Sequence, residues 1–186
     1  MKIQYKVNKE KYDIFINKNL NDSLAKKIDS IKSDKKILLI YDKKIYKPLV
    51  KKIINHLRET GSLLIALEFQ GKKKNKNEKS LFNLLNVMID NHFSKKSIVI
   101  SLGGGVLGDL AALAASLYHR GTIYFNIPAT MTSIIDSCIG GKTAINYKNI
   151  INSIGNYYQP HAVFILYEII KEIPEREFIA GIPEII

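Results

Sequence analysis

The chain has 186 residues, of which 46% are hydrophobic, and a formal net charge of +11. A chain of this length buries roughly 70% of its unfolded surface, so we expect one compact domain. The sequence contains no run of about 18 uncharged apolar residues and no signal-peptide core near its start, which predicts neither a membrane span nor secretion. Cys138 is the single cysteine, so no internal disulfide can form and a reduced, cytoplasmic protein is expected.

The net charge first suggests nucleic-acid binding, because clustered cations gain affinity by releasing counterions from phosphates. Only three of the 28 basic residues are arginines, however, whereas base readout and bidentate phosphate binding rely on arginine. No nucleic-acid partner is therefore predicted. The densest basic run, GKKKNKNEK at 71–79, is expected to be a solvated loop.

The pattern of apolar residues predicts an antiparallel ribbon followed by alternating strands and helices. The ribbon is expected at 2–7 and 12–16, with a turn at 8–11. Short apolar runs predict strands covered on both faces, at 36–41, 63–69, 97–102, 122–127 and 162–166. Helical periods lie between them, at 20–31, 45–58, 79–91 and 108–118. This order predicts an α/β fold with a doubly wound, mostly parallel, Rossmann-like sheet, in which ligands bind beyond the carboxyl ends of the strands.

A glycine-rich segment, SLGGGVLGD, follows one predicted strand and opens the next helix. Gly103, Gly105 and Gly108 match the spacing G-x-G-x-x-G, which lets a backbone approach a pyrophosphate at a helix N-terminus. The motif is weak alone, because the acid usually found about 20 residues later is not evident. A tight turn with small residues for packing is the alternative, but the flanking strand and helix favour phosphate binding. Asp109 fits a carboxylate near a helix N-terminus.

A second segment, DSCIGGKTAIN, contains GKT at 141–143, the three residues with which a P-loop motif ends. A P-loop also needs glycine where Asp136 stands, so an NTPase interpretation fails. What remains is a Gly-Gly turn that presents Lys142, which with Asp136 and Arg120 makes a mixed-charge set suited to a polyhydroxylated anion. A structural ion pair between Asp136 and Lys142 is the alternative. Cys138 lacks a histidine in a nucleophile pattern and is expected to be a small buried thiol.

A third segment, NSIGNYYQP at 152–160, is expected to be a loop whose aromatic residues pack before the last strand. The four histidines show no metal-binding spacing, so each is expected to be a surface or packing residue. The final residues, EREFIAGIPEII at 175–186, are expected to form the first turns of an amphipathic helix.

Together these segments indicate a protein family far more specifically than any one of them does. The motifs SLGGGVLGDLAALAA, YHRG, IPAT, DSCIGGKTAIN, IGNYYQP and IPEREFIAGIPEII, in this order and spacing, resemble the 3-dehydroquinate synthase family of the shikimate pathway. The resemblance runs from residue 97 to 186 and is looser before. It implies an NAD-binding α/β domain at 1–172, and at 173–186 the start of a C-terminal helical, metal-binding domain that is otherwise missing here.

The resemblance also implies roles for individual residues. The NAD-binding set would be Asp42, Lys79, Gly104, Gly105, Val106, Leu107, Gly108, Asp109, Ala129, Thr130, Lys142, Ile169, Ile170, Lys171 and Glu172. The catalytic and substrate-binding set would be Arg120, Asp136, Lys142 and Asn152. Glu184 would be the first ligand of a divalent metal, zinc or cobalt, whose other ligands lie outside this chain.

The implied reaction converts 3-deoxy-D-arabino-heptulosonate 7-phosphate to 3-dehydroquinate and phosphate, in aromatic amino acid biosynthesis. It is a cyclising, phosphate-eliminating lyase reaction with transient oxidation by NAD and a metal ion as Lewis acid. The implied partners are the sugar phosphate and either a second copy of the chain or a complementary C-terminal half, with no nucleic acid and no membrane.

The chain departs from the family pattern at several positions. Ile151 stands where the family usually has a lysine directly before the asparagine of the third segment, and Lys76 stands where it usually has an acid. Paired threonines appear as Ala129 and Thr130, and a usual aspartate is Leu166. Three interpretations stay open: the N-terminal part of a dehydroquinate synthase, inactive alone; a related sugar-phosphate cyclase with another substrate; or a non-catalytic remnant that folds and binds NAD or another subunit.

Overall fold

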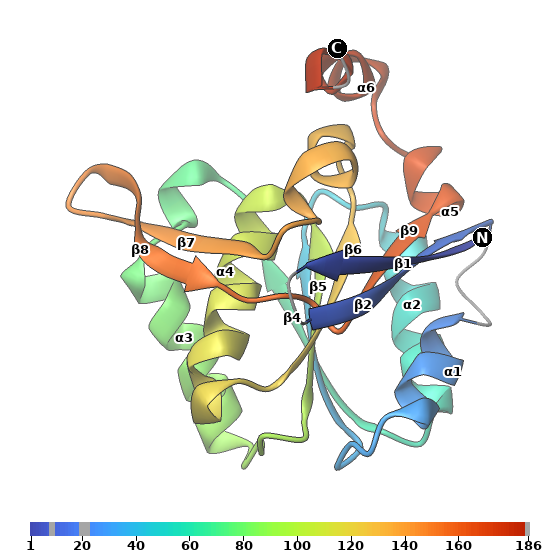
Figure 1. The fold of residues 1–186 in the computed structure, drawn as a ribbon, viewed down its shortest axis with the longest axis vertical. Coiled ribbons are helices and arrows are strands. Elements are labelled where there is room, and N and C mark those ends of the chain that lie inside the picture. Colours follow the sequence, from blue (N-terminus) through green and yellow to red (C-terminus); the bar gives the residue numbers. More distant parts are fainter. Residues whose placement is uncertain (8–9, 19–22, 185–186) are drawn as a thin grey trace.

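A seven-stranded sheet with helices on both faces forms the body of the fold (Figure 1). The computed structural model describes residues 1–7, 10–18 and 23–184. The strand order is β1-β2-β9-β6-β5-β3-β4, and every neighbouring pair is parallel except β1 with β2. The expected doubly wound α/β fold with an N-terminal antiparallel ribbon is therefore confirmed.

The elements have the following bounds. The sheet strands are β1 Lys2–Val7, β2 Glu10–Asn17, β3 Lys36–Asp42, β4 Leu63–Phe69, β5 Ile98–Gly103, β6 Ile123–Pro128 and β9 Ala162–Leu166, and a separate hairpin contains β7 Lys142–Tyr147 and β8 Ile150–Tyr157. The helices are α1 Ser23–Ser30, α2 Lys47–Glu59, α3 Glu78–Asp90, α4 Gly105–Leu117, α5 Tyr167–Ile170 and α6 Glu175–Ala180. Short turns are η1 Lys73–Asn75, η2 Tyr118–Arg120, η3 Ser133–Ser137 and η4 Ile182–Glu184. Among these described helices, none has the length and apolar character that crossing a membrane requires.

The five strands predicted for the main sheet all occur, within one residue of their expected ends. Two predictions at this level are wrong. The strand at 63–69 is not covered on both faces: β4 is the edge of the sheet, and each of its residues is exposed or half-buried. The segment at 152–160 is not a loop, because 152–157 belong to β8. Parts of the turn predicted at 8–11 and of the helix predicted at 20–31 lie outside the described residues.

The core consists of two layers, one on each face of the sheet. In β3, Ile37 and Leu39 face the layer that contains α1 and α2, whereas Leu38 and Ile40 face the layer that contains α3 and α4. All four side chains are fully buried. Burial of each contributes about 1.5–3 kcal/mol, which holds β3 in place between β4 and β5.

Helix α4 is buried on nearly all sides. It is rich in alanine and leucine around its whole circumference, and such a helix needs cover on its outer side as well. The β7–β8 hairpin supplies that cover by packing β7 against α4 (Figure 1). The hairpin turn consists of Lys148 and Asn149, both with positive φ, as in a type I′ turn. This turn lacks the glycine that usually marks such hairpins, which explains why the sequence did not reveal it.

The order of the parallel strands creates a crevice between β3 and β5. Strands β4, β3, β5, β6 and β9 follow the order 2-1-3-4-5 by sequence, so the chain leaves β3 and β5 toward opposite sides. At such a switch point the loops diverge and leave a space at the carboxyl ends of the strands. The segment from α5 to α6 lies beyond this edge, at the top of Figure 1.

Asp13 in β2 attaches the N-terminal ribbon to α1. Its carboxylate forms ion pairs with Lys2 at 3.1 Å and Lys27 at 2.9 Å. Burial acts to raise the pKa of Asp13, but the two ammonium groups outweigh that effect, so the pKa lies below its ordinary value. The resulting stabilisation is present above the unfolded-state pKa and is lost as the pH falls through the folded-state pKa.

We therefore expect Asp13→Asn to lower the free energy of unfolding at pH 7 by about 1.5 kcal/mol. Urea unfolding between pH 7 and pH 3 checks this, and the variant should lose less stability on acidification than the unmodified chain. Asp29→Asn, an exposed change on α1, is the control and should leave both values unchanged. Identical acid dependence in the unmodified chain and Asp13→Asn would contradict the account.

Candidate active site

A cavity of about 310 Å³ opens at the carboxyl ends of β3 and β5, where the switch point lies. Its walls come from the end of β3 and the start of α2, from Gly71, from the glycine-rich loop at 103–107, from residues 129–130, and from the segment 169–177. Segments far apart in the sequence thus meet at one site. We refer to this site as the nucleotide cavity.

The first turn of α4 supplies the positive end of a helix to the nucleotide cavity. The helix begins at Gly105, three residues earlier than predicted, and Gly104 precedes it in an extended conformation without a side-chain cap. Glycine is a poor helix former, which is why the sequence placed the start too late. Uncapped amide groups at a helix N-terminus bind anionic groups such as phosphate.

The glycines at this turn also allow close packing against two neighbouring segments. A Cβ atom on Gly104 would lie 3.1 Å from Thr130 Cγ2, and one on Gly105 would lie 2.8 Å from Ser137 Oγ. The two interpretations of the motif, phosphate binding and tight packing, are therefore compatible. The same missing side chains leave the amides of the turn accessible from the cavity.

Asp42 places a carboxylate on the other wall of the nucleotide cavity. It ends β3, and its Oδ1 accepts a hydrogen bond from the backbone amide of Lys44 at 3.0 Å. Its Oδ2 faces Gly71, where an added Cβ would lie only 2.1 Å away. A carboxylate held this way can accept hydrogen bonds from hydroxyl groups of a ligand in the cavity.

The structure separates the predicted NAD-binding residues into two groups. Those that line the nucleotide cavity are Asp42, Gly104, Gly105, Val106, Leu107, Ala129, Thr130, Ile169 and Glu172. Those that do not are Lys79, Gly108, Asp109, Lys142, Ile170 and Lys171. Sequence reasoning missed the lining residues 44–46, Leu49, Gly71, 173–174 and Glu177. The first of these follow the strand at the switch point, and the loops there line the crevice in doubly wound sheets, so this signal was available.

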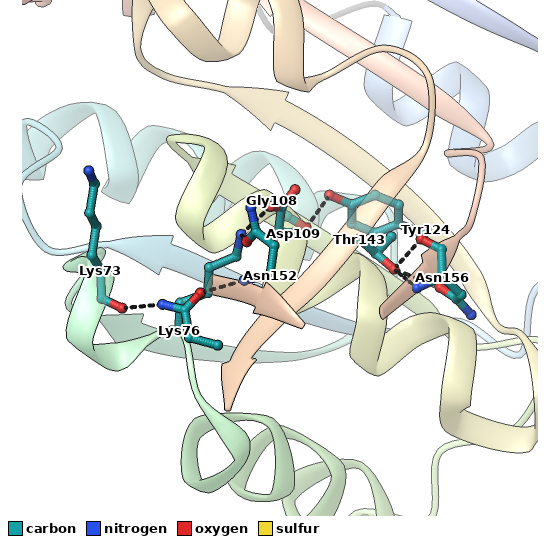
Figure 2. Close-up of polar contacts among 9 residues, drawn as sticks. Lys73, Lys76, Gly108, Asp109, Tyr124, Thr143, Asn152 and Asn156 are labelled. Carbon is teal, nitrogen blue, oxygen red and sulfur yellow. Dashed lines mark hydrogen bonds and ion pairs between the residues drawn. The ribbon is translucent and has the colours of Figure 1, made fainter. Parts of the chain in front are cut away.

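Beside the first turns of α4 lies a second group of polar side chains. Lys76 forms an ion pair with Asp109 and donates a hydrogen bond to Asn152 Oδ1 at 2.5 Å, as Figure 2 shows. Lys76 is only 7% exposed, so the prediction that 71–79 is a solvated loop is wrong at this residue. The loop turns inward there because the carboxylate of Asp109 compensates for the buried ammonium.

Asp136 and Lys142 complete this group. Burial raises the pKa of the Asp109 carboxyl above its ordinary value, the cations of Lys76 and Lys142 oppose that shift, and the negative charge of Asp136 adds to it. Both residues thus act on Asp109 electrostatically. In the described parts of the chain no ion pair joins Asp136 to Lys142, which removes the structural alternative weighed for them. We refer to Lys76, Asp109, Asp136, Lys142 and Asn152 as the polar cluster.

Arg120 lies apart from the other predicted substrate-binding residues. It is exposed in η2, at the end of α4 that is remote from the nucleotide cavity. A helix of 13 residues is roughly 20 Å long, so within one chain Arg120 cannot line the same site. Its proposed role stays a prediction.

Cys138 and the four histidines give no sign of reactive or metal chemistry. Cys138 is buried against β2 and β9, and burial raises the pKa of its thiol to about 12, which confirms the expectation of an inert core thiol. In the described segments, no group of three His, Cys, Asp or Glu side chains could hold a metal ion. The backbone of Glu184 ends η4, whereas its side chain is not among the described parts.

Comparison with solved structures defines the class of fold. A 2-deoxy-scyllo-inosose synthase complexed with carbaglucose-6-phosphate, NAD⁺ and Co²⁺ superposes with a TM-score of 0.85 at 24% identity, over 98% of this chain and 49% of that one. A 2-epi-5-epi-valiolone synthase from Streptomyces hygroscopicus with NAD⁺ and Zn²⁺ bound gives 0.83 at 25% identity, over 96% and 49%. The chain therefore has the fold of about half of each of these cyclases.

Sequence comparison identifies the particular family. The family model described as 3-dehydroquinate synthase N-terminal matches residues 66–180. The 3-dehydroquinate synthase of Clostridium tetani is 39% identical over 95% of this chain and 47% of its own length, and that of Pelagibacter ubique is 36% identical over 100% and 50%. The chain belongs to the 3-dehydroquinate synthase family. It spans about half the length of the curated relatives it matches.

The close approach of Gly71 to Asp42 predicts that a side chain at position 71 lowers the stability of the fold. A methyl group at position 71 would overlap Asp42 Oδ2, so Gly71→Ala should lower the free energy of unfolding by about 1–3 kcal/mol. Urea unfolding of the two single variants and the double variant checks the cause. In the Asp42→Ala background the cost of Gly71→Ala should largely disappear, and an undiminished cost there would show that the carboxylate is not responsible.

Proposed function

We propose that this chain is the NAD-binding half of a 3-dehydroquinate synthase, which converts 3-deoxy-D-arabino-heptulosonate 7-phosphate to 3-dehydroquinate and phosphate. The observation that carries the proposal is the nucleotide cavity, where an uncapped helix N-terminus and a buried carboxylate face one space at the switch point. The two cyclases with this fold were solved with NAD⁺, which supports the same cofactor here.

The residues of the nucleotide cavity suit the parts of a dinucleotide. The amides of Gly105 and Val106 would hold the pyrophosphate, because they lie in the uncapped first turn of α4. Asp42 would accept hydrogen bonds from ribose hydroxyls. Ile169 and Pro174, on the opposite wall, would cover an apolar part of the ligand. When bound, NAD supplies reversible hydride acceptance and is not consumed overall.

The polar cluster is the proposed site for the sugar phosphate. It combines two ammonium groups, two carboxylates and one amide beside the first turns of α4. Ammonium and amide groups donate to phosphate, carboxylate and hydroxyl oxygens, while a carboxylate accepts from hydroxyls. The cluster would thereby hold and orient a polyhydroxylated anion beside the cofactor.

The described residues do not by themselves form a metal site. Glu184 would be its first ligand and the remaining ligands would come from outside this chain, as catalytic zinc usually takes three protein ligands. We assign no catalytic step to the metal here. For this reason, and because the chain matches only half of its relatives, we expect no turnover from the 186 residues alone.

A related sugar-phosphate cyclase with another substrate is the second candidate, supported by the two structural neighbours. Sequence identity favours the first candidate, because the dehydroquinate synthases are 32–39% identical and the other cyclases 24–25%. A non-catalytic remnant would bind NAD as both of these candidates do, but it would catalyse no reaction. Mixing the chain with the C-terminal half of a relative and assaying dehydroquinate formation tests the first candidate against the other two.

Calorimetric titration with NAD tests the central part of the proposal. We expect a dissociation constant on the order of 1 mM for the chain alone, which corresponds to about −4 kcal/mol. Asp42→Ala should weaken binding roughly tenfold, because a charge-assisted hydrogen bond to the ribose is lost. Asp29→Ala, an exposed change on α1 that does not line the cavity, is the control. Absence of binding and of any thermal shift at millimolar NAD would rule out the cofactor.

A further inference from the structure

Lys76 differs from its neighbours in the basic loop at 71–79. Lys73 and Lys74 are exposed, and Figure 2 shows the side chain of Lys73 extending away from the polar cluster. Lys76 instead points inward to Asp109 and Asn152. Burying a lysine is costly unless partners compensate for its charge, so the loop conformation depends on these two contacts.

The backbone connects this loop to the hairpin. The amide of Asn146 donates to the carbonyl of Lys76 at 2.8 Å, and its side-chain nitrogen donates to the carbonyl of Lys73 at 3.2 Å. Asn146 Oδ1 accepts a hydrogen bond from the amide of Asn152 at 3.0 Å. Asn146 of β7 thus joins the loop at 71–79 to β8 through hydrogen bonds.

The conformation of β8 turns Asn152 toward Lys76. The ladder between β7 and β8 is irregular between Ile145 and Tyr147, and Asn152 opposite has a φ of 53°. Asparagine tolerates this left-handed conformation better than most residues, and bulges commonly redirect a side chain. The amide of Asn152 therefore reaches an ammonium that comes from a loop 76 positions earlier in the chain.

This contact determines which end of the Asn152 amide remains for a ligand. Lysine has only donors, so the group that faces Lys76 must be the carbonyl oxygen of Asn152. Across the described segments, the side-chain nitrogen of Asn152 has no protein partner, and the residue is exposed. The end left for a ligand is consequently a pure hydrogen-bond donor.

We propose that Lys76 is a positioning residue that fixes Asn152 as a donor to a phosphate or carboxylate oxygen bound at the polar cluster, outside the nucleotide cavity. The assignment of that anion to a sugar phosphate rests on the proposed function. Neither Ile151 nor Ser153, the neighbours of Asn152, is charged, so Lys76 supplies the nearby cation from another element.

The test uses the ¹⁵N-labelled 186-residue chain and inorganic phosphate as the probe. The side-chain amide signals of Asn152 are followed by NMR during phosphate titration, and NAD is titrated separately. Lys76→Met removes the charge at similar length, Lys76→Arg keeps a donor-only cation, and Lys73→Met is the matched control with the same charge loss on an exposed residue of the loop. Lys76→Leu replaces Lys76→Met if thermal melting shows that the latter does not fold.

We expect phosphate to shift the Asn152 signals with similar midpoints, within about twofold, in the unmodified chain, Lys76→Arg and Lys73→Met. In Lys76→Met or Lys76→Leu the midpoint should rise about tenfold, a ratio equal to about 1.4 kcal/mol. An unchanged midpoint in these variants, or no response of Asn152 in the unmodified chain, overturns the proposal. The NAD titrations report separately on the nucleotide cavity: a phosphate response at Asn152 without NAD binding supports the role of Lys76 while removing the proposed cofactor.

Discussion

The divergence of the chain between β3 and β5 is the constraint on which the rest of the site depends. Helix α2 follows β3 on one face of the sheet, and α4 follows β5 on the other. Neither connection therefore covers the carboxyl ends of β3 and β5. The space left there is the nucleotide cavity. It brings the Asp42 carboxylate opposite the uncapped start of α4, two features that suit a dinucleotide.

The second constraint is the burial of α4. A helix apolar on every side needs cover beyond the sheet, and the β7–β8 hairpin provides it. The same packing brings Asn152 of β8 and Lys142 of β7 toward Asp109 on the helix. The nucleotide cavity and the polar cluster therefore both lie beside the first turns of one helix.

Much of this organisation could be predicted from sequence because it depends on strong local signals. Short apolar runs such as 97–102 predicted buried parallel strands, and glycines between a strand and a helix predicted the turn at the cavity. The hairpin was missed because β8 is exposed along its whole length and alternates too weakly to reveal a strand. The burial of Lys76 could not be found either, because its partners Asp109 and Asn152 are remote in sequence and meet only in the fold.

A crystal structure of the chain with NAD tests the central claim most directly. The account predicts the dinucleotide in the cavity between β3 and β5, with its pyrophosphate against the amides of Gly105 and Val106 and a ribose hydroxyl within hydrogen-bonding distance of Asp42. Density for NAD elsewhere on the chain, with the first turn of α4 free of phosphate, would contradict the account.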